Sequence, residues 1–150
     1  NIIKTTPNAI IITERCLFTD KYVFAKMLYE SGNMTKIEYD IYMRWHAWLL
    51  DKFKFTDRAE AFIYLRTSPD ISLERIQKRE RGGESKISLD YLNTLHELHE
   101  DWLVKNQDKD SNILILDISK NIYEDEKEKQ KIIEQLSDFL KMLSEKGFIL

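Results

Sequence analysis

The sequence predicts an α/β fold with a parallel sheet, and two kinds of segment carry this prediction. Short, unbroken apolar runs lie at 9–13, 61–66 and 113–117, as in strands that are buried on both faces. Amphipathic stretches with helical spacing lie between and after these runs. Only four glycines and two prolines interrupt the 150 residues, so we expect little irregular structure.

The helices are predicted from their caps and their apolar spacing. Residues 20–30 predict a short, aromatic-rich helix, and Thr35 with Glu38 forms a capping box that opens the next one. Ser68 followed by Pro69 predicts a helix directly after the second run. Further helices are predicted at 88–104 and 126–146. The helix after Thr35 carries a common apolar face, formed by Ile37, Ile41, Trp45, Trp48 and Leu49.

The composition predicts one globular domain, since 43% of the residues are hydrophobic and 33% are charged. The net charge of −3, with interleaved acids and bases, argues against duplex nucleic acid as a partner. No apolar run approaches the roughly 18 residues of a membrane helix. The single cysteine, Cys16, indicates the cytoplasm or another reducing intracellular compartment. We interpret it as a small buried residue rather than a nucleophile.

The sequence begins at Asn1 and enters an apolar run without a basic leader of the kind that a signal peptide requires. Three strands are few for a sheet with helices on both faces. We therefore expect further strands upstream of this sequence.

Ligands of open parallel sheets bind at the carboxyl ends of the strands. Glu14 and Arg15 follow the first run, and together they could hold a divalent cation and a phosphate. The alternative is a solvated ion pair at a strand end. Thr67 and Ser68 follow the second run, and residues 117–122 end and follow the third.

Three arginines form the second candidate site. Arg75 and Arg79 are four residues apart and share one helix face. Arg81 lies just beyond, where Gly82 and Gly83 are expected to break the helix into a loop. Such a cluster could close over a polyphosphate and neutralise charge in phosphoryl transfer. The alternative is an ordinary exposed, charged helix end.

Two further groups are interpreted as structural. His96 and His99 do not have the spacing of a zinc protease, and no other cysteine or histidine cluster completes a metal site. We expect them to pack and form hydrogen bonds. Trp45 and Trp48 are expected in a core or a dimer interface rather than in a ligand site.

Three stretches of the sequence together resemble the deoxyribonucleoside kinases. Residues 14–25 read ERCLFTDKYVFA, which is similar to the family's motif E-R-S-x-[YF]-S-[DA]-R-Y-x-F. The pattern YLRTSP at 64–69, LER at 73–75 and R-x-R-x-x-E at 79–84 resembles the family's lid region. The match continues in register through I-x-L-x-Y-L-x-x-L-H-x-x-H-E-x-W-L at 87–103. The similarity continues through the third run and the last helix.

The resemblance implies a P-loop kinase-like fold with three α/β/α layers, of which residues 1–150 form the C-terminal part, with a lid at about 75–87. The activity it implies is the ATP-dependent phosphorylation of the 5′-hydroxyl of a deoxyribonucleoside in nucleotide salvage. It further implies ATP and Mg²⁺ as cofactors. A homodimer formed through aromatic helices is also implied.

Roles at the substrate follow from the same resemblance. Glu14 would help to coordinate Mg²⁺, and Arg15 would contact the 5′-oxygen and the transferring phosphoryl group. Asp20 stands where the family's deoxycytidine and deoxyguanosine kinases hydrogen-bond the base, which favours cytosine or purine deoxynucleosides over thymidine. Glu84 would accept a hydrogen bond from the 3′-hydroxyl of the sugar.

The resemblance also implies a donor site. Arg75, Arg79 and Arg81 would be lid arginines that clamp the phosphates of ATP and stabilise the transition state. Asn121 and Ile122 would lie near the adenine of ATP, in the loop after the last strand.

Several positions depart from the family pattern. Cys16 replaces the usual serine, and Lys21 replaces an arginine, with loss of bidentate geometry. Glu80 and the pair at 82–83 also differ from the common lid. No G-x-x-x-x-G-K-[ST] phosphate-binding loop occurs in the sequence, so we expect these 150 residues alone to be inactive.

Two alternatives remain open. One is a homologue without a P-loop that serves as a binding or scaffold subunit, although the retained charges at 14–15 and 75–84 argue against it. The other is a nucleoside monophosphate kinase, against which the patterns at 14–15 and 91–103 argue.

Overall fold

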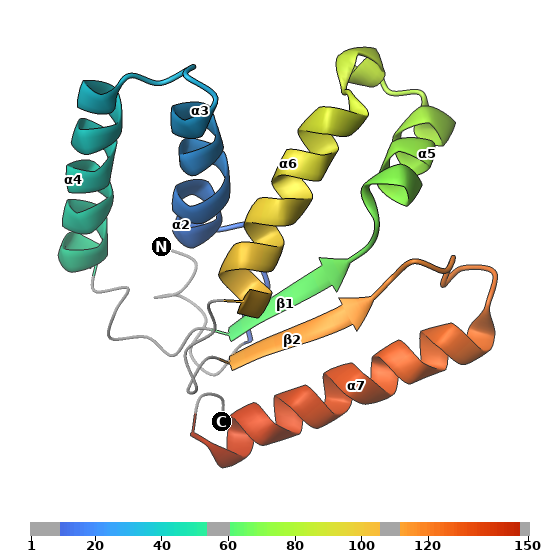
Figure 1. Ribbon diagram of the computed structural model, residues 1–150. Helices are drawn as coiled ribbons and strands as arrows, with labels where there is room; N and C mark the ends of the chain where they lie inside the picture. The colour runs from blue at the N-terminus through green and yellow to red at the C-terminus, as the bar shows by residue number, and fades with distance from the viewer. Residues whose placement is uncertain (1–9, 54–60, 106–111, 148–150) are drawn as a thin grey trace.

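Helices and strands alternate along the chain in the computed structural model, which describes residues 10–53, 61–105 and 112–147 (Figure 1). Two of the helical segments, η1 and η4, are π-helical, and η3 is a 3₁₀-helix. The elements in chain order are α2 (Leu17–Thr19), η1 (Asp20–Ala25), α3 (Lys26–Glu30), α4 (Lys36–Phe53), β1 (Ala61–Arg66), α5 (Pro69–Arg79), η3 (Glu84–Lys86), α6 (Leu89–Glu100), η4 (Asp101–Lys105), β2 (Asn112–Asp117) and α7 (Glu126–Glu145).

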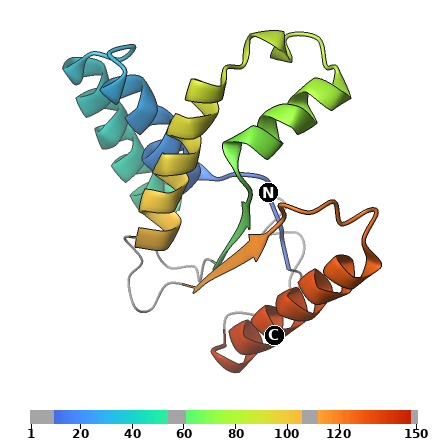
Figure 2. The same ribbon diagram turned by 45° about the vertical axis from the view of Figure 1, so that its right-hand side comes forward.

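The two strands form a parallel sheet, which confirms the predicted α/β fold. Ala61 lies opposite Asn112 and Arg66 lies opposite Asp117, so the strands are in register over their whole length. The N–H of Ile118 extends the pairing by donating to the carbonyl of Arg66 at 2.9 Å. Helix α7 lies on one side of the strands, and α6 with the helices of 17–30 lies on the other (Figures 1 and 2).

The first predicted strand is wrong for residues 10–13, whereas Ala9 lies outside the described residues. These residues are exposed, Ile12 to 76%. A strand must satisfy its N–H and C=O groups through a neighbouring strand. In the described part of the chain the sheet consists of β1 and β2 alone, and neither pairs with this segment.

The predicted caps of α4 and α5 are confirmed. The Thr35 N–H donates to Glu38 Oε2 at 2.8 Å, and the Glu38 N–H donates to Thr35 Oγ1 at 3.3 Å. The Ser68 hydroxyl accepts the N–H of Ile71, and Pro69 occupies the first helical position. Each cap satisfies backbone donors that the first turn of a helix leaves unpaired.

The π-helical segments η1 and η4 were not predicted, and they meet in the structure. Tyr22 of η1 stacks on Trp102 of η4 with ring centroids 5.2 Å apart. The Trp102 ring also meets Phe62 of β1 edge-on at 5.2 Å. These contacts join η1 to η4, and η4 to the sheet.

The core lies between the sheet and the helices on its two sides. Its buried apolar residues are Val23, Ala25, Tyr64, Leu98, Leu103, Leu116, Phe139 and Leu143. Trp45 and Trp48 of α4 are not part of it, with 60% and 51% of their surface exposed. Cys16 is also exposed, so its predicted burial is wrong: it immediately precedes the first turn of α2.

The sequence contains no apolar run of the length of a membrane helix, and the lengths and compositions of the helices test this. None of the helices within the described ranges is both long and apolar enough to cross a membrane.

Candidate functional site

The carboxyl ends of β1 and β2 lie at one edge of the sheet, as parallel pairing requires (Figure 1). Asp117 ends β2 and accepts the N–H of Ser119 at 2.9 Å. Hydrogen bonds from Ser119, first from its side chain, hold the pKa of Asp117 below its usual value. Thr67, which follows β1, has a buried hydroxyl without a hydrogen-bond partner among the described residues.

Arg75 reaches from α5 to the loop after β2. Its Nη2 donates to the carbonyl oxygens of Ile118 at 2.7 Å, Ser119 at 3.2 Å and Lys120 at 3.3 Å. The structure therefore places this arginine beside the segment that carries Asn121 and Ile122, which are also predicted site residues. The side chain of Asn121 accepts the N–H of Tyr123 at 3.1 Å and shapes the turn.

Arg79 and Glu84 pair with each other across the turn after α5. Arg79 Nε donates to Glu84 Oε2 at 2.7 Å, and its Nη2 donates to Glu84 Oε1 at 2.8 Å. The predicted break between the two residues is confirmed, although the helix already ends at Arg79. Glu80 ends it in the left-handed conformation with φ 44°, which is unusual for a residue other than glycine.

Arg81 is exposed, and its carbonyl accepts the N–H of Glu84 at 3.2 Å, whereas its guanidinium makes no hydrogen bond or ion pair with the residues that the structure describes. The turn that carries it joins α5 to α6 at the ends of these helices remote from the sheet (Figure 1). Glu14 and Arg15 precede α2 and are far from this turn in the sequence. The structure therefore brings Arg79, Glu84 and Arg81 together at one tip, but does not join them to Arg15.

Arg15 has a left-handed backbone with φ 63°, a strained conformation for a residue with a Cβ. Its carbonyl accepts a hydrogen bond from Thr13 Oγ1 at 3.2 Å. Its guanidinium lies over the ring of Phe24, 4.8 Å from the centroid. Glu14 is exposed and forms no ion pair with a described residue. Its carboxylate is therefore open to an incoming ligand.

Asp20 faces α4, where Tyr42 donates its hydroxyl to Asp20 Oδ2 at 2.7 Å. Burial, and then this hydrogen bond, raises the pKa of Tyr42. Beside the pair is a pocket of about 350 Å³ between α4 and the helices of 17–30. It is lined by Leu17, Asp20, Glu38, Ile41, Tyr42, Trp45, His46 and Leu49.

His46 lies at the side of this pocket and is 3% exposed. Its Nε2 donates to the carbonyl of Leu17 at 3.2 Å. Burial, followed by the nearby charge of Lys21, lowers the pKa of this imidazole. A neutral ring is therefore favoured in the folded protein.

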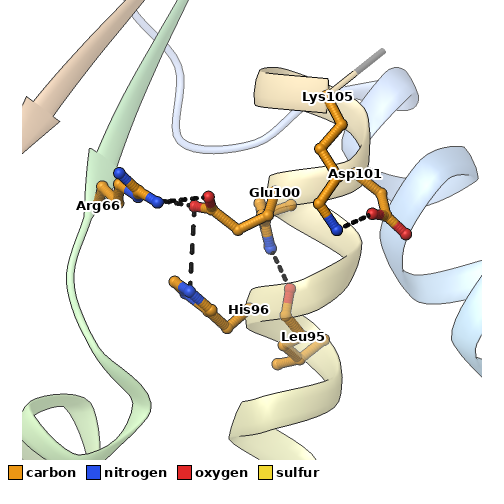
Figure 3. Close-up of polar contacts among 7 residues, drawn as sticks. Arg66, Leu95, His96, Glu100, Asp101 and Lys105 are labelled. Atoms are coloured by element: carbon orange, nitrogen blue, oxygen red, sulfur yellow. Dashed lines mark hydrogen bonds and ion pairs between the residues drawn. The ribbon is translucent and has the colours of Figure 1, made fainter.

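An ion pair at the end of β1, between an exposed arginine and a buried glutamate, was not predicted from the sequence. Arg66 Nε donates to Glu100 Oε1 at 2.9 Å and its Nη2 donates to Oε2 at 2.6 Å (Figure 3). Glu100 is only 9% exposed. Burial, and then a hydrogen bond with Glu100, raises the pKa of Tyr64. His96 Nε2 approaches Glu100 Oε1 at 4.0 Å from the preceding turn of α6.

His99 stacks on Tyr64 at 5.7 Å and donates from Nδ1 to the carbonyl of Leu95 at 2.7 Å. Burial lowers the pKa of His99, and the charges of Arg15 and His96 lower it further. The predicted packing and hydrogen bonding are confirmed for His99, whereas His96 only approaches Glu100 at ion-pair distance. The only sequence signal for the Arg66–Glu100 pair is a charged residue at the end of an apolar run. Nothing in the neighbouring sequence indicates which residue it pairs with.

The structure is a mixed helical and parallel-strand protein of the P-loop kinase-like α/β class, with an arginine-bearing helical hairpin beyond the carboxyl end of β1. The chain belongs to the deoxynucleoside kinase family, whose sequence model matches residues 2–141. This confirms the predicted family and fold class.

Individual relatives carry the similarity over most of the chain. Deoxycytidine kinase 2 of Gallus gallus is 40% identical over 134 residues, which are 85% of this chain and 51% of that protein. Deoxycytidine kinase of Homo sapiens is 35% identical over 147 residues, or 94% and 56% of the two chains. The mitochondrial deoxyguanosine kinase of Xenopus laevis is 39% identical over 94 residues, or 63% and 36%. The chain spans about half the length of the curated relatives it matches.

Proposed function

We propose that this chain forms part of an enzyme that transfers the γ-phosphoryl group of ATP to the 5′-hydroxyl of a deoxyribonucleoside. The observation that carries the proposal is the family match over residues 2–141, together with the relatives named as deoxycytidine and deoxyguanosine kinases. The activity serves nucleotide salvage in the cytoplasm or another reducing compartment.

Glu14 and Arg15 act at the reacting phosphoryl group. Mg²⁺ is held in proteins by one or two carboxylates together with phosphate oxygens and water. Glu14 fits this requirement because its exposed carboxylate has no partner in the described part of the chain. When bound, the ion neutralises phosphate charge. Arg15 contacts the 5′-oxygen and the transferring group, and its strained backbone fixes where its side chain leaves the main chain.

Arg79, Arg81 and Glu84 act from the lid. Arginine suits phosphate because its planar fork donates two parallel hydrogen bonds. In the free protein Arg79 and Glu84 are paired through Nε and Nη2 of the arginine, so these two nitrogens must leave Glu84 before they bind a phosphate. Arg79 and Arg81 then bind ATP and stabilise the charge of the transition state, and Glu84 accepts the 3′-hydroxyl.

Asp20 selects the base of the nucleoside. Its carboxylate already accepts a hydrogen bond from Tyr42, which orients it and leaves its second oxygen for another donor. An exocyclic amine is such a donor, so cytosine and purine deoxynucleosides are preferred over thymidine.

A second copy of this chain is proposed as the partner. The apolar face of α4 exposes Trp45 and Trp48, and an exposed apolar patch of this kind marks an interaction surface. The homodimer forms through this aromatic helix.

The test is phosphorylation of the four deoxynucleosides by the protein at the length that its gene encodes, with ATP and Mg²⁺. The variant Arg81→Gln removes a proposed transition-state contact, while Arg81 holds no described partner whose loss would disturb the fold. We expect kcat to fall by about a hundredfold. Lys78→Gln is the matched control, because it removes the same charge from the exposed surface of α5, and it should leave kcat unchanged.

Two results would contradict the proposal. Phosphorylation of deoxynucleoside monophosphates but not of deoxynucleosides would assign a nucleoside monophosphate kinase. No turnover with any acceptor, by a protein that folds and binds nucleoside, would assign a scaffold subunit.

A further inference from the structure

The inference concerns Arg75 and the loop that joins β2 to α7, residues 118–125. It rests on the proposed function and on the expectation from the family resemblance that Asn121 and Ile122 of this loop lie near the adenine of ATP. The loop is already organised in the free protein. Asp117 accepts the N–H of Ser119, and the Asn121 carbonyl accepts the N–H groups of Glu124 and Asp125 at 3.1 Å each.

Arg75 ties this loop to α5 across a long stretch of sequence. The carbonyl oxygens of Ile118, Ser119 and Lys120 converge on its Nη2. Three consecutive carbonyls that point to one side present the negative ends of their dipoles to the same place, which favours a cation there. The guanidinium supplies this cation, and hydrogen bonds to a charged donor are stronger than those between neutral groups.

The three arginines of the α5 region therefore differ in what they contact. Arg79 is paired with Glu84, and the guanidinium of Arg81 has no partner among the described residues. Arg79 ends α5 and Arg81 lies in the turn beyond it, whereas Arg75 lies one turn nearer to the sheet and is bound to backbone. Moving Nη2 of Arg75 to a phosphate would leave three carbonyl oxygens without their donor.

We propose that Arg75 is a positioning residue for the donor nucleotide: it holds the loop of 118–125 in place beneath the base and does not itself clamp phosphate. Its loss weakens the binding of ATP because the loop must then be ordered when the nucleotide binds. It leaves the phosphoryl-transfer step unaffected, because that step depends on groups that contact the phosphates.

The first measurement is amide hydrogen exchange of the nucleotide-free protein at its encoded length. In Arg75→Gln, the protected amides of residues 118–125 should exchange about tenfold faster, since a charged hydrogen-bond donor has been lost. Lys78→Gln, the control with the same charge change on α5, should leave them unchanged. Unchanged exchange in Arg75→Gln, or an equal increase in both variants, would show that Arg75 does not hold the loop in place and would overturn the proposal. The exchange measurement needs no kinase activity. It therefore tests whether Arg75 holds the loop independently of whether the proposed function is correct.

The second measurement is steady-state kinetics with varied ATP. For Arg75→Gln we expect the KM for ATP to rise about tenfold while kcat at saturating ATP stays within about twofold of the wild type. A fall of kcat like that expected for Arg81→Gln would instead identify a phosphate clamp and overturn the proposal.

A second variant loosens the same loop without touching α5. Asp117→Ala removes the acceptor of the Ser119 N–H. It should raise exchange in the loop and the KM for ATP in the same direction as Arg75→Gln, again with kcat retained. If the loop loosens in Asp117→Ala and the KM does not change, loop position does not govern ATP binding and the proposal is wrong.

Discussion

Arg66 and Glu100 form the best-defined polar contact at the strand ends. Both nitrogens of the fork are used, and Glu100 is buried while half of the Arg66 side chain is exposed. Taking away one partner of such a pair leaves the other charge poorly compensated. The contact ties the end of β1 to the last turn of α6, and so fixes where the lid hairpin leaves the sheet.

This pair predicts a measurable coupling. Arg66→Gln should lower the free energy of unfolding by about 1–2 kcal/mol. The loss is modest because water can replace part of the hydrogen bonding that the half-exposed guanidinium provides to Glu100. The double variant Arg66→Gln with Glu100→Gln should lose less than the sum of the two single variants. Chemical denaturation of all four proteins tests this. Additive losses would mean that the two side chains do not stabilise one another.

The buried histidines predict how stability depends on pH. Burial lowers the pKa of His46 and of His99 in the folded protein. Below the unfolded value of about 6.5, the unfolded chain therefore binds more protons than the folded one, and stability falls as pH falls.

The check is urea denaturation of wild type and His99→Gln at several pH values between about 7.5 and 5.5, above the usual carboxylate range. The wild type should lose stability towards the lower pH, and His99→Gln should show a shallower loss, since His46 remains. Parallel slopes for the two proteins would show that His99 does not titrate differently on folding.

Helix α5 carries the lid arginines, and its two ends are fixed by different means. Ser68 and Pro69 cap its first turn. Its other end depends on Glu80, which adopts a left-handed conformation that glycine adopts more readily. The second end is therefore the less favourable one.

Glu80→Gly should raise the free energy of unfolding by about 0.5–1 kcal/mol, because it removes the steric penalty of a Cβ at this position. Glu80→Ala removes the same charge but keeps a Cβ, and should give no such gain. Thermal or chemical unfolding distinguishes them. A gain of equal size in both variants would place the effect in the charge and not in the backbone.

Local patterns were predicted well because their causes lie within a few residues. The capping box of Thr35 and Glu38 and the cap at Ser68 involve partners three residues apart. The strand predicted at 10–13 was wrong because strand formation depends on a distant partner. The contacts of Arg75 with the loop at 118–120, more than 40 residues away, leave no local trace either.

At the scale of the whole molecule, helix α4 presents an apolar side that the described part of the chain does not cover. Ile37, Ile41, Trp45 and Trp48 are each more than half exposed. Uncovered aromatic surface of this kind favours association. The proposed homodimer covers it.

Light scattering of the protein at its encoded length should give the mass of two chains. Trp48→Lys should reduce that mass to one chain, because a charge would be buried in the interface. Ala47→Lys places the same charge on the neighbouring exposed position of α4 and should leave the dimer intact. A single-chain mass for the wild type, or a dimeric Trp48→Lys, would exclude this face as the dimer interface.

The pairing of Arg79 with Glu84 also bears on how an anion approaches the free protein. Long-range attraction depends on uncompensated charge, and it is screened by salt within about 10 Å at 0.1 M ionic strength. Of the three arginines of the α5 region, Arg79 is neutralised by Glu84 and Arg75 faces backbone carbonyls. The carbonyls carry no net charge, so a polyphosphate arriving from solution meets the charges of Arg75 and Arg81, and its association rate should depend on salt as if two of these three charges were steering it.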